Sequence, residues 1–265
     1  MSAVDTYRAY RRWATEELTG QVAMSVVIPA FNEQERILPT VGAIATHMCA
    51  RGQPWELIVA DDGSTDSTVA LLDDLRFPNM RVLRTDRNRG KGSAVRRGVL
   101  AARGSYVLFA DADQSTPIEQ LDRLLDELHR GRDLVMGSRA VSGAAVRGRS
   151  LLRRVLSCGL RAVVAMGSGV RVSDSQCGFK LFTADAARVL FERQRVDGFS
   201  FDLELLYLCH KLGLRTAEVP VEWVDAPGST VAAARVSVQF VVDLVKIRIN
   251  DLLGRYGCLG ERRSR

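Results

Sequence analysis

The chain has 265 residues, of which 46% are hydrophobic and 26% charged, and its formal net charge is +6. This length allows one large α/β domain or two small ones, and the charge indicates an anionic partner such as nucleic acid, a nucleotide phosphate or an acidic membrane surface. The five cysteines are widely spaced and form no C-x-x-C pair. That pattern indicates neither a disulfide framework nor a zinc site, and a reducing, cytoplasmic setting fits it best.

The first 20 residues are polar, and no apolar run approaches the roughly 18 residues of a membrane-spanning helix. We therefore expect no signal peptide and only peripheral contact with a membrane. Tyr7, Tyr10, Trp13 and Leu18 recur at approximate helical spacing, which predicts a short amphipathic helix. This helix either packs on the domain, which we favour, or lies on another surface.

Apolar runs then alternate with helical patterns along the first half of the chain. Buried strands are predicted over residues 23–29, 56–60, 81–85, 106–110 and 133–137. Helices are predicted between them, up to about residue 51, over 67–75, up to about 104, and over 117–130. This alternation indicates an α/β fold with a parallel, doubly wound sheet.

A polar cluster stands at the end of each predicted strand. The clusters are Asn32 with Glu33, Asp61 with Asp62, residues 88–93, residues 111–114, and Ser138 with Arg139. Ligands bind at the carboxyl ends of the strands in sheets of this kind. We therefore expect the five clusters to share one edge of the sheet and to form a phosphate-and-metal site.

Asp111 and Asp113 are the centre of this expectation. They are one residue apart where the fourth strand ends, so both carboxylates can point to the same side. Two such carboxylates repel each other unless a cation lies between them, and Mg²⁺ or Mn²⁺ carrying a phosphate is the usual occupant. A strand end followed by an Asx turn would explain this pair by itself. Because polar clusters follow all five predicted strands, we favour the metal site over the Asx turn alone.

The second half of the chain opens on a basic stretch. Residues 139–173 contain seven arginines and no aspartate or glutamate. Apolar residues at helical spacing predict an amphipathic helix over 150–166, with a basic face that binds an anion or, alternatively, is only solvated. Later patterns predict a turn and strand over 174–182, helices from about 184 and over 199–213, a strand over 216–224, and a helix over 236–256. The broad apolar face of this last helix covers the domain, lies in a membrane interface, or both.

The motifs at the strand ends resemble those of family 2 GT-A glycosyltransferases. In chain order they are VIPAFNE at 27–33, VADDGSTD at 59–66, NRGKG at 88–92, ADAD at 110–113 and GSR at 137–139. Three later segments are similar to dolichyl-phosphate beta-glucosyltransferases and their bacterial polyprenyl-phosphate relatives: DSQCGFKLF at 174–182, FDLELLY at 201–207 and DLVKIR at 243–248. The resemblance covers nearly all of the chain after residue 23. It implies a GT-A fold with C-terminal amphipathic helices.

The resemblance also implies a role for each matched residue. Those that would bind the nucleotide sugar are Pro29, Phe31, Glu33, Asp61, Asp62, Lys91, Asp111 and Asp113. Asp111 and Asp113 would hold its pyrophosphate through Mg²⁺ or Mn²⁺, and Asp113 and Arg139 would be catalytic. Residues that would face the acceptor phosphate are Arg139, Arg149, Arg153 and Ser157. Residues that would lie near the sugar or in the second half of the domain are Gln176, Lys180 and Asp202.

The implied reaction is inverting transfer of a hexose from a nucleotide sugar to a polyprenyl or dolichyl phosphate by in-line displacement. UDP-glucose is the favoured donor. Negative charge develops on the departing pyrophosphate, and a metal and an arginine would offset it. A lipid phosphate is already an anionic nucleophile, so it needs cations and no general base. The alternatives are a hydroxyl acceptor, with Asp202 or Glu204 as the base, and a GDP-mannose donor.

The chain departs from the glucosyltransferase pattern at two points. Gln114 stands where a small residue is usual, which leaves its part in metal binding open, and we expect no membrane-anchoring segment of the kind that such enzymes usually have. We divide the chain into an N-terminal helical extension over 1–23, a GT-A catalytic domain over 24–230, and a C-terminal amphipathic helix with a basic tail over 231–265. We expect it in the cytoplasm, at the cytoplasmic face of a membrane.

Other classes of protein fit the sequence less well. The Gly-Lys pair at residues 90–91 lacks the upstream glycine and the following Ser or Thr of a P-loop, which argues against an NTPase. A nucleotidyltransferase would carry a glycine-rich basic loop after the first strand, where this chain has PAFNE. A basic module that binds nucleic acid or membranes without catalysis ranks low, because no aromatic residues are interleaved with the arginines to stack on bases. We therefore expect no nucleic-acid partner.

Overall fold

The structure is a computed structural model that describes residues 2–147, 173–224 and 233–257. Its strands are β1 (Met24–Ala30), β2 (Trp55–Asp61), β3 (Met80–Leu83), β4 (Tyr106–Ala110), β5 (Leu134–Ser138), β6 (Ala145–Arg147), β7 (Phe179–Thr183), β8 (Thr216–Pro220) and β9 (Glu222–Val224). Its helices are α1 (Ala3–Thr15), α2 (Ile37–Ala50), α3 (Thr68–Leu75), α4 (Lys91–Leu100), the 3₁₀ turn η1 (Ile118–Gln120), α5 (Leu121–His129), α7 (Ala184–Arg193), α8 (Phe201–Leu212) and α9 (Ala233–Leu252).

The main sheet is mostly parallel. Its strand order is β3-β2-β1-β4-β7-β5-β8, and every neighbouring pair is parallel except the two pairs that β7 makes. β7 runs antiparallel between β4 and β5, with Ala110 opposite Phe179 at one end. Because β7 starts where β4 and β5 finish, the segment just before β7 also lies at the carboxyl edge. The mostly parallel sheet is confirmed, and the antiparallel β7 is a feature that the apolar pattern did not indicate.

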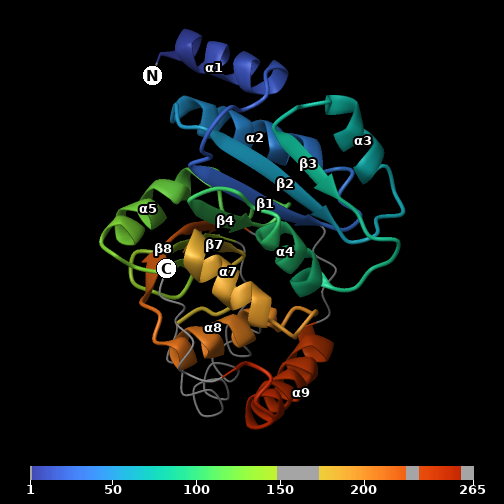
Figure 1. Ribbon diagram of the computed structural model, residues 1–265, viewed down its shortest axis with the longest axis vertical. Helices are drawn as coiled ribbons and strands as arrows, with labels where there is room; N and C mark the ends of the chain where they lie inside the picture. The colour runs from blue at the N-terminus through green and yellow to red at the C-terminus, as the bar shows by residue number, and fades with distance from the viewer. Residues whose placement is uncertain (1, 148–172, 225–232, 258–265) are drawn as a thin grey trace.

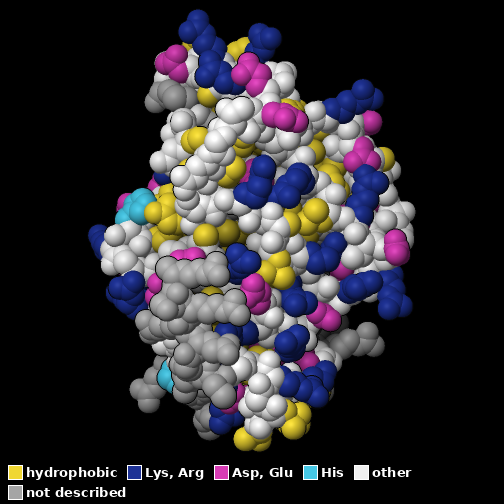
Figure 2. All heavy atoms as spheres, in the orientation of Figure 1, with side chains coloured by type: hydrophobic (Ala, Val, Ile, Leu, Met, Phe, Trp, Pro, Cys, Tyr) yellow, Lys and Arg dark blue, Asp and Glu magenta, His cyan; other side chains and the backbone are white. Residues whose placement is uncertain are grey.

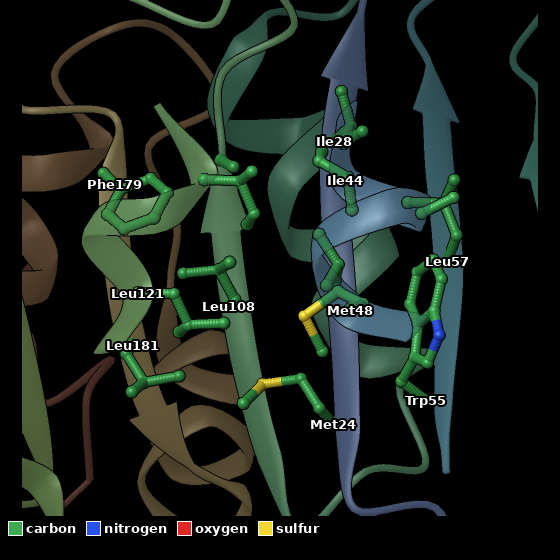
Figure 3. Close-up of a cluster of buried hydrophobic side chains, with 14 of the residues drawn as sticks. Met24, Ile28, Ile44, Met48, Trp55, Leu57, Leu108, Leu121, Phe179 and Leu181 are labelled. Carbon is green, nitrogen blue, oxygen red and sulfur yellow. The ribbon is translucent and has the colours of Figure 1, made fainter. Parts of the chain in front are cut away.

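Helices cover both faces of the sheet, giving three layers (Figure 1). Successive strand residues face opposite layers, as the pleat requires. Val26 and Ile28 pack with α2 and α5 in one core, whereas Val27 packs with α4, α7 and α8 in the other. Figure 3 shows the first core, where Ile44 and Met48 of α2 lie over β1 and β2. Burial on both faces explains why β1 and β2 are continuous apolar runs, buried at every position.

The predicted N-terminal helix packs on the domain, as favoured. The Trp13 ring of α1 is buried and stacks on Trp55 with ring centroids 4.3 Å apart, and its indole N–H donates to the Trp55 carbonyl at 3.0 Å. The Asn79 amide donates to the carbonyl oxygens of Trp13 and Glu16 and so holds the end of the helix. Tyr7 points away and is exposed. α1 is therefore anchored by one side through Trp13.

The second half of the chain agrees less closely with the predicted boundaries. The strand expected over 216–224 is divided: β8 joins the main sheet, whereas β9 pairs with β6 in a separate two-stranded sheet. The break falls at Pro220, whose ring removes a backbone donor. The predicted basic helix over 150–166 lies outside the described residues. Among the residues that the structure describes, no helix is both long and apolar enough to cross a bilayer.

α9 packs with α8 in the second core through Phe240 and Ile247, which are buried, as is Leu244. Its opposite side is not polar: the exposed apolar residues there are Val241, Val242, Val245, Ile249, Leu252 and Leu253. Figure 2 shows hydrophobic side chains at the surface at this lower end of the molecule, and basic and acidic side chains intermixed over the region of α3 and α4. The apolar face predicted for this helix therefore both covers the domain and remains open to solvent.

Candidate active site

The polar clusters predicted at the strand ends do gather at one edge of the sheet. β1, β2, β3, β4 and β5 are all parallel to one another and end at this edge, and β7 begins there. Glu33, Asp61, Asp113 and Arg139 thus come from four different strand ends. The candidate site is built on the loops that follow these strands.

The loops after β1 and β2 are hydrogen-bonded to each other. Asn32 has a left-handed φ of 56°. Its side-chain Oδ1 accepts from the Thr65 backbone N–H at 2.9 Å, and its own backbone N–H donates to the Ser64 hydroxyl at 2.9 Å. Asp61 accepts from the amides of Gly63 and Ser64, both at 3.2 Å. This arrangement fixes the positions of Phe31 and Glu33, two of the predicted nucleoside-pocket residues.

The predicted pocket residues differ in exposure. Phe31 is 41% exposed beyond the end of β1, which leaves its ring free to contact a ligand. Pro29 is buried within β1 opposite Ala60, and Asp61 is buried at the end of β2. Phe31 is therefore exposed and Glu33 half-buried, so both are accessible to a ligand at this edge, whereas Pro29 and Asp61 are buried.

Asp62 organises the neighbouring loop. Its carboxylate accepts from the backbone amides of Arg89 at 3.1 Å and Gly90 at 2.7 Å. Gly90 has φ of 111° and leaves no room for a side chain, because a Cβ there would overlap the Asp197 carbonyl. Buried Asp62 thus fixes the conformation that places Lys91 at the start of α4.

Lys91 pairs with Asp111, the first of the two central carboxylates. The Lys91 ammonium lies 2.6 Å from Asp111 Oδ1 and 5.5 Å from the centre of the Phe109 ring. Burial opposes the charge on Lys91, but attraction by Asp111, Asp202 and Asp113 outweighs it and raises the Lys91 pKa. On the other side, Gly178 packs so tightly that an added Cβ would overlap the Asp111 carboxylate. Asp111 is held between Lys91 and Gly178.

Asp113 lies in the loop just beyond Asp111. Its Oδ1 accepts from the Ser115 amide at 2.9 Å, the Asx turn that the sequence also suggested. Gln114 adopts a left-handed φ of 52°, and its amide nitrogen donates to the Thr40 hydroxyl at 3.3 Å. Desolvation raises the pKa of Glu33, Arg36 lowers it, and Asp113 and Asp111 raise it further by repulsion. The Glu33 carboxylate, which pairs with Arg36 at 2.7 Å, therefore also lies within electrostatic range of Asp113 and Asp111.

A second buried ion pair lies behind Asp111. The fully buried Lys180 ammonium contacts Asp202 Oδ1 at 2.7 Å and donates to the Cys177 carbonyl at 2.6 Å. Desolvation raises the pKa of Asp202, while Lys180 and Lys91 lower it. Charges of opposite sign thus alternate from Asp111 through Lys91 and Asp202 to Lys180. This network connects the site to α8, where the sequence placed Asp202.

Arg139 is paired rather than free. Its Nε donates to Asp174 Oδ2 at 2.7 Å and its Nη2 to Oδ1 at 2.9 Å, and the guanidinium lies 5.3 Å from the centre of the Trp223 ring. Burial alone would raise the pKa of Asp174. The hydrogen bonds and the charge of Arg139 outweigh this effect and lower the pKa to about 2. A bidentate, partly buried pair of this kind holds the guanidinium in one orientation.

The Glu204 carboxylate is engaged by hydrogen bonds from neighbouring segments. Its carboxylate accepts from the amides of Arg195 and Val196, at 2.9 and 2.8 Å, and from the Tyr256 hydroxyl at 2.5 Å. Arg195 and Val196 belong to the segment between α7 and α8, and Tyr256 follows α9. The arrangement gives Glu204 a structural role and leaves it poorly suited to act as a base.

Some predicted residues lie outside the described residues, and some contacts escaped prediction. Arg149, Arg153 and Ser157 fall within residues 148–172, which the structure does not describe. The sequence did not reveal that Asp174 pairs with Arg139, although Asp174 is the first acidic residue after the acid-free basic stretch. It also did not reveal that Gly178 holds Asp111 in place. That role depends on contact across the β4–β7 pair.

The donor atoms at the end of β4 suit a hard divalent cation. No group of three metal-ligating side chains occurs within the described parts of the chain. Asp113 accepts from the Ser115 amide through Oδ1, and Asp111 precedes it by two residues, so carboxylate oxygens are present. Mg²⁺ is commonly held by one or two carboxylates together with substrate phosphates. The residues present fit that kind of site rather than a metal cage made by protein alone.

Comparison with known sequences gives consistent results. The family model described as "Glycosyl transferase family 2" matches residues 25–190. Dolichyl-phosphate beta-glucosyltransferase of Dictyostelium discoideum is 37% identical over 248 residues, which cover 88% of this chain and 76% of that protein. The enzymes of the same name from Saccharomyces cerevisiae and Homo sapiens are 36% and 33% identical, covering 89% and 88% of this chain and 77% of each relative.

Solved structures share the fold. Glucosyl-3-phosphoglycerate synthase from Mycobacterium tuberculosis, in complex with Mn²⁺, UDP-glucose and phosphoglyceric acid, superposes with a TM-score of 0.64 at 23% identity, covering 97% of this chain and 85% of that one. Mannosyl-3-phosphoglycerate synthase from Rubrobacter xylanophilus gives 0.64 at 20% identity, covering 98% and 82%. These similarities confirm the GT-A architecture expected from the motifs.

Proposed function

Because the chain belongs to glycosyl transferase family 2, we propose that it transfers glucose from UDP-glucose to the phosphate of a polyprenyl lipid. The observation that carries the proposal is the position of Asp111 and Asp113 at the carboxyl edge of the sheet, directly after β4. This pair occurs in a chain whose relatives over most of their length are dolichyl-phosphate beta-glucosyltransferases. Glucose as the sugar and a lipid phosphate as the acceptor follow from the names of those relatives.

The donor would lie across the ends of β1, β2 and β4. Phe31 and Glu33 would contact the nucleoside, and Lys91 would face the pyrophosphate. Asp113, with Asp111, would hold Mg²⁺ or Mn²⁺. When bound there, the cation supplies positive charge where the leaving pyrophosphate becomes more negative. The support for a metal is the oxygen donor set of this structure, together with the crystal structure of a similarly folded synthase in complex with Mn²⁺ and UDP.

The acceptor would be an anionic oxygen that attacks the anomeric carbon in line with the departing nucleoside diphosphate. Attack from the opposite side inverts the configuration, which agrees with the beta linkage in the names of the relatives. A hydroxyl acceptor would need a general base. The two carboxylates considered for that role have other partners, since Asp202 pairs with Lys180 and Glu204 accepts from two amides and a tyrosine. This supports a phosphate acceptor.

A lipid acceptor requires access to a membrane surface. α9 offers exposed apolar residues, among them Val245 and Leu252, with exposed Lys246 and Arg248 on the same helix. Apolar and basic groups together favour anionic lipid surfaces. The protein would then act as a peripheral enzyme at the cytoplasmic face. Cys49, Cys177 and Cys209, free thiols among the described residues, suit that reducing compartment.

The test is a transfer assay with radiolabelled sugar donors and extraction of product into organic solvent. We expect label from UDP-glucose to appear on dolichyl or undecaprenyl phosphate with Mn²⁺ or Mg²⁺, to be absent with EDTA, and to be lost in Asp113→Asn. GDP-mannose and a polyprenol with a free hydroxyl serve as the competing donor and acceptor. Transfer to the polyprenol but not to the lipid phosphate would contradict the proposed acceptor.

A further inference from the structure

Lys91 covers one oxygen of Asp111. Its ammonium lies 2.6 Å from Oδ1, which is buried, and the two side chains are only 22% and 28% exposed. The rings of Phe109 and Phe199 lie near the ammonium, with their centres 5.5 and 5.8 Å from it. These contacts place the lysine where a cation would have to approach Oδ1.

The other oxygen of Asp111 lies against backbone. An ideal Cβ on Gly178 would overlap the Asp111 carboxyl group and lie nearest to Oδ2, so that oxygen occupies the space where a side chain would start. The Asp111 amide in turn donates to the Gly178 carbonyl at 3.0 Å, which ties the two backbones together. A metal can therefore reach Oδ1 only after Lys91 moves, and Gly178 limits how far the carboxylate can turn instead.

Lys91 has a second carboxylate nearby. Asp202 attracts the Lys91 ammonium more strongly than any other carboxylate except Asp111. Asp202 is itself held by Lys180 at 2.7 Å and stays buried at the start of α8. When Lys91 leaves Asp111, it keeps a negative neighbour.

We propose that Lys91 competes with the divalent cation for Asp111, so that the nucleotide-free site binds metal weakly and acquires it together with a nucleoside diphosphate. The phosphates of the nucleotide then replace Asp111 as the anionic partner of Lys91. This inference rests on the proposed function, because it takes the metal-bound nucleotide as the ligand of the edge. It makes Lys91 a positioning residue that sets the order of binding.

Metal affinity of the nucleotide-free protein is the direct test. Mn²⁺ is titrated by calorimetry into wild type, Lys91→Met and Lys91→Gln, with no nucleotide present. We expect both variants to bind Mn²⁺ at least about tenfold more tightly than wild type, an effect in the range usual for coupled binding. Lys91→Gln is included because it removes the charge but keeps a polar end group, in case the apolar methionine disturbs folding, and far-UV circular dichroism checks the fold of each.

Two controls isolate the pair. Lys211→Met removes a lysine of similar exposure, 18% against 22%, that pairs with Asp251 between α8 and α9, and we expect no change in Mn²⁺ affinity. Adding Asp111→Asn to Lys91→Met removes the carboxylate that the lysine was covering. The gain in affinity should then disappear, as a double-mutant cycle requires for a direct interaction.

The outcomes separate this inference from the proposed function. Unchanged or weaker Mn²⁺ binding in both Lys91 variants, while wild type binds UDP with Mn²⁺, overturns the competition and leaves the donor site intact. Failure of wild type to bind any nucleotide would count against the proposed function. The Mn²⁺ titrations without nucleotide would still decide whether Lys91 shields Asp111.

Discussion

Asp111 owes its position to a residue that has no side chain. A methyl group at residue 178 would overlap the Asp111 carboxylate, and the backbone hydrogen bond between the two residues limits how far either can move. We therefore expect Gly178→Ala to fold but to bind UDP with Mn²⁺ about 10²-fold more weakly, because a displacement of about 1 Å in a site is costly. Calorimetry of UDP in the presence of Mn²⁺ measures the change.

Gly42→Ala is the matched control for that substitution. Gly42 lies in α2, and no atom lies within 4 Å of the Cβ that alanine would add. Alanine there should leave UDP binding unchanged and raise helix stability slightly. Equal nucleotide affinity in Gly178→Ala and wild type would show that Asp111 does not need its present position.

The Arg139–Asp174 pair makes a pH-dependent contribution to stability. The Asp174 pKa is lowered from 3.8 to about 2 in the folded protein, which corresponds to about 2 kcal/mol at neutral pH. Because the folded-state pKa is the lower one, this contribution is complete above pH about 4 and is lost as the pH falls toward 2. Asp174→Asn should therefore be less stable than wild type at pH 7 by about this amount or more, and the difference should shrink in acid.

Urea unfolding of both proteins between pH 7 and pH 3 provides the measurement. Asp73→Asn is the control, because Asp73 forms a surface pair with Arg84 in which both side chains are about half exposed. Such pairs contribute less than about 1 kcal/mol. A difference between wild type and Asp174→Asn that stays constant with pH would contradict the pairing.

Single residues also mark where prediction from the sequence stops. Asp111, Asp113 and Glu33 were found because each follows a recognisable apolar strand. Their partners were not, because Lys91 meets Asp111 and Arg139 meets Asp174 only after distant segments are brought together, the latter 35 residues apart. A sequence indicates which residue carries a charge, but the neutralising partner depends on the packing of the folded chain.

At the scale of elements, the first half of the chain was predictable because its central strands are buried by helices on both faces. β1, β2, β4 and β5 were each predicted to within one residue at either end. The direction of β7 was not predictable, since an apolar run looks the same whether its neighbours run with it or against it. The division of the expected strand over 216–224 depended on Pro220 and on β6 as a partner for β9.

We expect α9, and not α1, to bind a membrane. α1 buries Trp13 against Trp55, whereas α9 exposes Val245 and Leu252, which are 54% and 86% accessible. We expect the protein to float with vesicles of phosphatidylcholine and phosphatidylglycerol at low salt. Val245→Glu with Leu252→Glu should reduce the floating fraction several-fold, because charged groups do not enter the apolar interface.

The matched control is a double substitution on α1. Val4 and Tyr7 are 59% and 61% exposed, so Val4→Glu with Tyr7→Glu adds the same charges at the other end of the molecule. These changes should leave flotation almost unaltered. Loss of flotation in the α1 variant alone would place the membrane-binding surface on α1 instead.

At the scale of the whole molecule, α1 and α9 lie at opposite ends of the long axis (Figure 1). A single flat membrane would therefore meet one of them, and the interface would be made by α9. Almost every strand of the main sheet contributes a loop to the carboxyl edge, which explains why the motifs found there are spread from residue 27 to residue 139. The boundaries of the three-part division at residues 23 and 230 stay predictions.

The function proposed for this chain requires that Asp111 and Asp113 form a metal-dependent nucleotide site. Calorimetric titration of UDP, and of GDP for comparison, into wild type and Asp113→Asn, with Mn²⁺ and with EDTA, tests it most directly. We predict that UDP binds wild type with Mn²⁺, that EDTA abolishes this binding, and that Asp113→Asn weakens it strongly without lowering the melting temperature. UDP binding that is equal with Mn²⁺ and EDTA and unaffected by the substitution would contradict the claim.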